Sequence, residues 1–251
     1  MRRVVFASIV SLAGCAKTEQ APQVEQSRDS VPLAVTPKPE PAPVVFRTDS
    51  GSPRLVIDSA AKEPRLELRD GEFVVHLPHD MARVLADSLP GFAPIKRSSF
   101  DTSLVGWRDR QAANPEPPPL DPADSDAIWA AALSVAVGDF DGDSKRDIAM
   151  EGISGELYAS FFLLSASASR AQPALLYFRL PSSSAWVKAE KSVINYFTLV
   201  RPGKVSGFSE EEGDTPVLSL HHDAIDFGIF EKASELYYIE NGVVQVFTTS
   251  D

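Results

Sequence analysis

Apolar and polar residues alternate in several short stretches of the chain, a pattern that predicts half-buried β-strands. In the first half, this alternation runs through residues 54–58, 65–69 and 72–76, and Asp70-Gly71 is a hairpin turn signal between the last two. In the second half, we expect strands over 156–165, 174–180, 193–200, 217–221, 223–230, 235–239 and 243–248. Asn241-Gly242 is a strong hairpin signal between the last two of these. The pattern therefore predicts a mainly antiparallel sheet.

One stretch has helical rather than strand spacing. Its apolar positions are Leu77, Met81, Val84, Leu85 and Leu89, which would form one face of an amphipathic helix. Pro78 suits the first turn and Pro90-Gly91 would end the helix. We expect 93–125 to be irregular, with a long Pro-rich loop near 111–125, and 127–133 to hold a helical turn. The predicted fold class is α+β with one principal helix.

The apolar runs 132–137 and 148–150 flank an unusually acidic segment, Gly-Asp-Phe-Asp-Gly-Asp-Ser-Lys-Arg-Asp from 138 to 147. Calcium takes six to eight oxygen ligands, and a loop supplies them when alternate residues converge. Four carboxylates this close repel one another unless a cation lies among them. We therefore predict a calcium site whose ligands are Asp139, Asp141, Asp143, the backbone carbonyl of Lys145, and Asp147. The alternative is an acidic surface turn without a metal.

Asp-x-Asp-Gly-Asp-x-x-x-Asp-Ile, with a Gly just before it, resembles the calcium loop of FG-GAP and VCBS-type repeats. The resemblance implies a loop that joins two β-strands, in a class of proteins common outside the cytoplasm. Ser144 departs from it, because a Gly usually takes a left-handed turn at that position. The motif occurs once, and a propeller needs several repeats. A full propeller is therefore not expected.

The N-terminus resembles a bacterial lipoprotein signal. Arg2-Arg3 precede an apolar run from Val4 to Ala13, which is too short to span a bilayer. Leu12-Ala13-Gly14-Cys15 resembles the lipobox, which implies cleavage after residue 14 and lipidation of Cys15. The alternative is an ordinary signal peptide with a chance cysteine. By the same analogy, Ala16 permits export to the outer membrane, facing the periplasm.

Three segments follow from this reading: a signal peptide over 1–14, a lipidated and Pro-rich tether over 15–43, and a single α+β domain over 44–251. Alternating X-Pro in the tether favours extended polyproline II. A membrane partner is expected only through the lipid. The net charge of −11 argues against nucleic acid and against anionic lipid surfaces as partners.

Common catalytic motifs of hydrolases, zinc proteases and nucleotide-binding enzymes do not occur in the sequence. The only cluster of histidines is His221-His222, followed by Asp223. The aromatic residues Trp107, Trp129, Trp186, Tyr237 and Tyr238 could line a ligand groove or lie in the core.

Two functional hypotheses remain. The first is a non-enzymatic, lipid-anchored envelope protein that binds another envelope protein or polymer. The second is an envelope hydrolase that uses His221 or His222 with nearby carboxylates. Residues 72–251 also resemble a poorly characterised group of small exported bacterial proteins. The resemblance lies in Leu-Pro-Gly-Phe at 89–92, in the acidic loop and in the C-terminal tail. It implies the architecture and no reaction.

Overall fold

The computed structural model describes residues 53–69, 72–113, 133–184, 193, 195–209, 215–229 and 232–250. All of these belong to one compact unit of the chain, residues 42–251. The predicted signal peptide, Cys15 and the tether lie outside the described residues, as do Asp70-Gly71, Trp129, Trp186 and most of the predicted Pro-rich loop. None of the described helices is long and apolar enough to cross a membrane.

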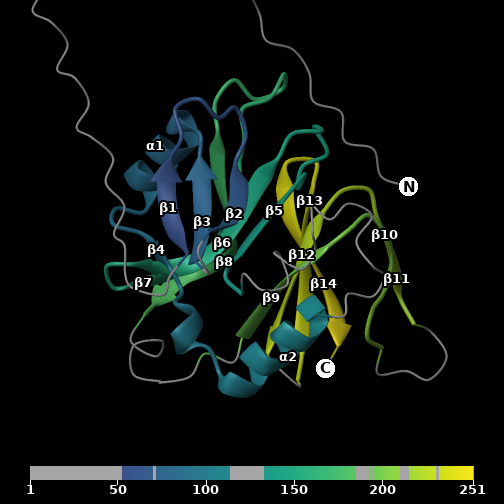
Figure 1. The fold of residues 1–251 in the computed structure, drawn as a ribbon. Helices are drawn as coiled ribbons and strands as arrows, with labels where there is room; N and C mark the ends of the chain where they lie inside the picture. Colours follow the sequence, from purple (N-terminus) through teal and green to yellow (C-terminus); the bar gives the residue numbers. More distant parts are fainter. Residues whose placement is uncertain are drawn as a thin grey trace, which may run out of the picture. The chain divides into compact units, whose positions relative to one another are not determined.

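The first layer contains a small sheet with a helix beside it (Figure 1). Strands β1 (Arg54–Ile57), β2 (Arg65–Arg69) and β3 (Glu72–Leu77) form it in the order β1-β3-β2. β2 and β3 pair antiparallel with Arg69 opposite Glu72, as the predicted hairpin requires. β1 lies parallel to β3, which local sequence does not predict. Helix α1 (His79–Ser88) follows directly.

A five-stranded antiparallel sheet forms the centre of the described structure. It consists of β4 (Ala93–Pro94), β5 (Val135–Gly138), β6 (Asp147–Ser154), β7 (Leu157–Leu164) and β8 (Ala174–Ser183). One edge of β6 pairs with β7. The other edge pairs first with β5 and then, further along, with β4. Almost every residue of β6 and β7 is buried, because both faces of this sheet are covered.

Alternate residues of β6 and β7 enter two different hydrophobic cores. Ile148 and Phe161 pack into a core shared with α1 and the first sheet. Ala149 and Phe162 point the other way, into a core shared with the third sheet. That sheet is antiparallel and consists of β14 (Val243–Ser250), β13 (Ser234–Glu240), β12 (Ala224–Ile229) and β9 (Asn195–Val200), in that order. The remaining described strands, β10 (Gly203–Ser206) and β11 (Val217–Leu220), pair antiparallel in a separate two-stranded sheet.

The α+β class with a mainly antiparallel sheet is confirmed, and the described strands form neither a closed barrel nor a propeller. The prediction that 93–125 is irregular was wrong for residues 93–113, and residues 114–125 lie outside the described part of the chain. Residues 93–113 contain β4, a single turn of 3-10 helix η1 (Arg97–Ser99), and a second helix, α2 (Thr102–Ala113). Among the described residues of α2, Leu104 is deeply buried and Val105 and Trp107 are partly buried beside it, while the sequence of the helix has almost no amphipathic period. The Asp101 carboxylate caps the helix by accepting the Ser103 N–H at 2.8 Å.

Candidate metal centre

The acidic loop connects two antiparallel strands, as predicted. β5 ends at Gly138 and β6 begins at Asp147, and these two residues lie opposite each other in the sheet. The intervening backbone makes two left-handed turns, at Gly142 (φ 77°) and at Ser144 (φ 66°). A left-handed non-glycine residue costs about 1 kcal/mol. Ser144 therefore adopts the strained conformation that its place in the motif indicates.

The carboxylate of Asp139 organises the turn of the loop. Its Oδ1 accepts the backbone N–H groups of Gly142 at 2.8 Å and Asp143 at 3.1 Å, and its Oδ2 accepts that of Ser144 at 2.9 Å. Three backbone N–H groups thus converge on this one carboxylate. Asp139 thus stabilises the loop conformation that brings the later aspartates back toward it.

Asp147 is the most buried acid of the loop, with none of its surface exposed. Its oxygens accept the N–H groups of Phe140 at 3.2 Å and Ser165 at 2.7 Å. Burial raises the pKa of Asp147 to about 8, the Ser165 N–H lowers it, and the nearby Asp141 carboxylate raises it further. A buried carboxylate must either take up a proton or face a positive charge.

Arg170 supplies one positive charge to the loop. Its Nη1 lies 2.7 Å from Asp141 Oδ2 and its Nη2 lies 4.0 Å from Asp143 Oδ2. The guanidinium also donates to the Ser165 carbonyl at 3.1 Å through Nε. Oδ2 of Asp143 is itself buried and accepts no hydrogen bond from any described residue. One guanidinium therefore faces several carboxylates and leaves one buried oxygen without a donor.

Three of the predicted ligands come together in space. One carboxylate oxygen each from Asp139, Asp141 and Asp147 lies within 4.8 Å of the other two. Asp143 is outside this group, and its Oδ1 accepts the Lys145 N–H at 2.8 Å. The Lys145 ammonium donates to the Ala166 carbonyl, and the metal-ligand role of the Lys145 carbonyl stays a prediction. An all-carboxylate donor set suits a hard divalent cation such as calcium.

Residues far away in the sequence complete the surroundings of the loop. Oδ2 of Asp223 accepts the Asp139 N–H at 2.9 Å and an Arg201 guanidinium N–H at 3.1 Å. Burial raises the pKa of Asp223, while these two donors lower it. The ring of His222 lies against Gly142, where an added Cβ would be 3.2 Å from Nδ1. No local signal identifies these residues as neighbours of the loop, because the packing of the third sheet against the central sheet places them there.

The predicted histidine cluster does not form a catalytic pair. His221 and His222 lie in a bend just after β11, so the predicted strand 217–221 ends one residue earlier, at Leu220. The His222 Nε2 bonds to the Ile239 carbonyl. In the part of the chain that the structure describes, neither histidine has a carboxylate within hydrogen-bond reach. The described histidine with such a partner is His76, whose Nε2 lies 2.9 Å from Glu67 Oε2 at the surface of the first sheet.

Comparison of the chain with models of protein families, with curated proteins and with solved structures found no match.

Proposed function

We propose that this chain is a lipid-anchored protein of the bacterial cell envelope whose binding domain is stabilised by one calcium ion. The observation that carries the calcium proposal is the convergence of Asp139, Asp141 and the fully buried Asp147. In this proposal the three carboxylates bind the ion, and the unpartnered oxygen of Asp143 is the next candidate ligand. The cation offsets the repulsion and burial of these charges, and its role is structural.

Calcium titration calorimetry of the full chain tests the metal site. We expect one calcium per chain, with a dissociation constant of about 0.1 to 1 mM, the range of extracellular modules. At about 10 mM calcium this corresponds to a stabilisation of roughly 1.4 to 2.7 kcal/mol over chelator. Asp141→Ala should abolish binding. Asp87→Ala, which removes an exposed carboxylate from α1, should leave it unchanged. Thermal melts that superimpose in chelator and in calcium would refute the proposal.

Arg170 distinguishes the proposal from a loop that needs no metal. If calcium supplies the neutralising charge, Arg170→Gln should keep or raise the calcium affinity, because a competing cation next to Asp141 is removed. The loss of stability in the Arg170→Gln variant should then become smaller when calcium is added. If Arg170 alone neutralises the loop, the variant should lose the same stability in calcium and in chelator.

The location in the envelope is supported by the lipobox-like sequence at Leu12–Cys15. A diacylglyceryl group plus an acyl chain would provide the several buried chains that stable anchoring requires. We expect the wild-type chain in the membrane fraction with a labelled acyl group, and Cys15→Ser without label and released from that fraction. A wild-type chain without label would overturn the anchor and leave the calcium proposal untouched.

The partner in this proposal is an envelope protein or polymer, and nucleic acid is disfavoured by the net charge of −11. The hydrolase hypothesis gains no support, because His221 and His222 lack a carboxylate partner among the described residues. A binding role needs a surface that can hold a ligand, and one cavity of the domain has the features of such a surface.

A further inference from the structure

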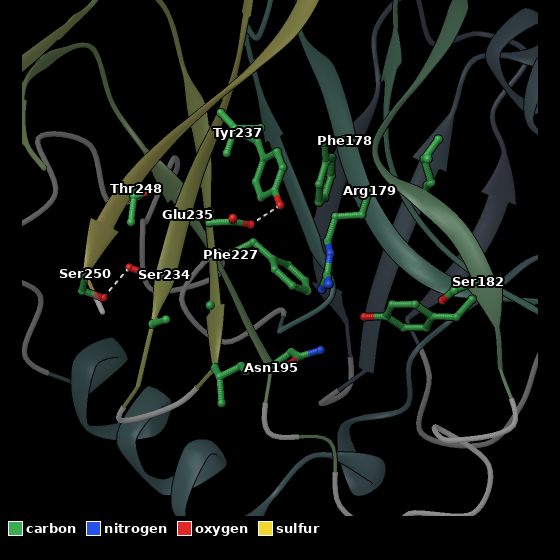
Figure 2. A pocket seen from close by; sticks show the side chains of 16 residues that line it. Phe178, Arg179, Ser182, Asn195, Phe227, Ser234, Glu235, Tyr237, Thr248 and Ser250 are labelled. Atoms are coloured by element: carbon green, nitrogen blue, oxygen red, sulfur yellow. Dashed lines mark hydrogen bonds between the residues drawn. The ribbon is translucent and has the colours of Figure 1, made fainter. Parts of the chain in front are cut away.

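A cavity of about 890 Å³ lies between the central sheet and the third sheet. Figure 2 shows it from close by: β8 contributes Phe178 and Arg179 on one side, and β12 and β13 contribute Phe227 and Tyr237 on the other. It shares no lining residue with the acidic loop. Its volume is in the range of sites that take small molecules.

An aromatic cluster forms the apolar wall of the cavity. The ring centroid of Phe178 lies 5.1 Å from that of Tyr237 and 6.1 Å from that of Phe227. These three side chains are otherwise buried in the core between the sheets, so their positions are set by packing. A rigid aromatic wall offers a large contact area to an apolar ligand at little cost in conformational entropy.

Apolar side chains at the edge of the cavity remain in contact with solvent. Leu180 is 86% exposed, Val246 53% and Ile229 38%. The three come from different strands, β8, β14 and β12, yet all line this one cavity. Apolar residues that gather around a concave site often mark a place where an apolar partner is buried. An apolar ligand that covers this edge would remove these three side chains from water.

Arg179 is the cation of the cavity. Its guanidinium carbon lies 4.8 Å from the centroid of the Phe227 ring, and Figure 2 shows the group pointing into the cavity. Among the described residues it forms no hydrogen bond and no ion pair. A guanidinium carries five N–H donors in a fixed plane, which suits carboxylate, phosphate or sulfonate oxygens. Stacking on Phe227 orients these donors in advance.

Each of the two acids near Arg179, Glu151 and Glu235, accepts a tyrosine hydroxyl. Glu151 is fully buried, and its Oε2 accepts the Tyr158 hydroxyl at 2.5 Å. Burial raises the pKa of Glu151 to about 8, so the group is mainly uncharged near pH 7. Glu235 also lines the cavity, and its carboxylate accepts the hydroxyl of Tyr237. Neither acid forms an ion pair with Arg179 among the described residues, so the guanidinium is the basic group of the cavity that a bound anion can reach.

We propose that this cavity binds a small amphipathic anion, with its apolar body on the aromatic wall and exposed edge and its anionic group on Arg179. Asn195 also lines the cavity and can add a hydrogen bond to the bound anion. Small amphipathic anions are then the ligand class of the proposed binding module. This proposal rests on residues separate from the calcium loop, so either proposal can fail while the other stands.

Two fluorescent probes with nearly the same body test this inference. Anilinonaphthalene sulfonate carries an anion, whereas N-phenyl-naphthylamine lacks it. Both are titrated into the folded full chain carrying Cys15→Ser, so that no attached lipid competes. We expect the sulfonate to bind with one site per chain and at least about tenfold more tightly than its neutral analogue, the scale of one charge-assisted contact. Equal affinity of the two probes would overturn the role of Arg179.

Matched variants locate the site. Arg179→Gln should weaken the sulfonate about tenfold and change the neutral probe less than twofold. Arg83→Gln removes the same charge from the exposed face of α1 and should change neither. Leu180→Ser should weaken both probes several-fold, whereas Leu68→Ser, on the first sheet and 50% exposed, should weaken neither. Identical behaviour of Arg179→Gln and Arg83→Gln would refute the site.

Competition in the unsubstituted cavity needs no variant that could misfold. Octanoate should displace the sulfonate probe, and octanamide at the same concentration should not. Octyl phosphate is included to separate carboxylate from phosphate ligands: the stronger of the two competitors defines the anionic group. Equal displacement by octanoate and octanamide would mean that the cavity takes neutral apolar molecules, and the proposal of an anion site would fail. Displacement by neither would mean that the cavity takes no small amphiphile.

Discussion

Asp139 and Asp223 hold each other through a reciprocal pair of hydrogen bonds. The Asp139 N–H donates to Asp223 Oδ2 at 2.9 Å, and the Asp223 N–H donates to the Asp139 carbonyl at 3.0 Å. The first residue opens the acidic loop after β5, and the second precedes β12 of the third sheet. Gly138 makes this approach possible, because a Cβ there would lie 2.5 Å from Asp223 Oδ2. The pair thus ties the loop to a different sheet.

Replacing Asp223 should show how much this tie contributes. Asp223→Ala leaves the partly buried N–H of Asp139 without its acceptor and removes the contact with Arg201, which we expect to lower the free energy of unfolding by about 2 kcal/mol. Asp223→Asn keeps an acceptor oxygen and should cost less than about 1 kcal/mol. Urea unfolding followed by circular dichroism measures both, with Asp87→Ala as the exposed control. Equal losses for the alanine and asparagine variants would show that the hydrogen bond is not the source of stability.

Two glycine-to-alanine substitutions should have opposite effects. In β6, a Cβ on Gly152 would lie 2.6 Å from the Phe92 ring and closer still to the backbone carbonyl of Ala93. We expect Gly152→Ala to destabilise the fold by about 3 kcal/mol or more, because backbone cannot yield as a flexible side chain can. In α2, a Cβ built on Gly106 would lie 3.6 Å from the flexible side chain of Arg110 and closer to no other described residue.

Gly106→Ala should therefore raise the unfolding free energy by about 0.5 to 1 kcal/mol through helix propensity. The same urea titration reports both variants. A loss of stability in Gly106→Ala, or a tolerated Gly152→Ala, would contradict the packing described for α2 or for β6.

Ser144→Gly should stabilise the protein. Ser144 has a φ of 66°, a conformation that glycine adopts without the penalty of a Cβ, while its N–H bond to Asp139 uses only backbone. We expect a gain of about 0.5 to 1 kcal/mol by thermal or urea unfolding. Ser169→Gly is the control, because Ser169 is exposed and is not among the residues with positive φ. It should be neutral or slightly destabilising, and a gain of equal size there would remove the argument from backbone strain.

Glu151 should make stability fall as pH rises. Burial raises its folded pKa from an ordinary 4.5 to about 8. Between these values the folded protein keeps a proton that the unfolded chain has released, so each rise in pH favours unfolding. This contribution is complete below pH 4.5, is lost as pH rises to about 8, and changes no further above that.

Glu151→Gln removes this titration while keeping a similar shape. The unfolding free energy of the variant relative to wild type should rise by about 3 to 5 kcal/mol between pH 4.5 and pH 9. Using the difference between the two proteins cancels the titration of the acidic loop, which both share. Parallel pH curves for the two proteins would show that Glu151 is ionised in the folded state.

Sequence alone identified those features whose cause is local. The alternation at 65–69 and 72–76 and the apolar spacing of Met81 and Leu85 predicted a hairpin and a helix that the structure contains. The acidic segment from 139 to 147 predicted a loop between strands, and its resemblance to the FG-GAP and VCBS loop implied a left-handed turn at the position of Ser144, where φ is 66°. Local signals suffice here because neighbouring residues along the backbone make these contacts with one another.

Tertiary structure decided the features that depend on contacts between distant residues. α2 was missed because its sequence has almost no amphipathic period, and the contacts of Leu104, Val105 and Trp107 with a core of distant residues hold it in place. The tie between Asp139 and Asp223, separated by 84 residues, appears only when the third sheet folds against the second. The same packing places Arg179 over Phe227 and creates the cavity. Strand pairing between distant segments is set by the sum of many side-chain contacts, and no single stretch of the sequence contains that sum.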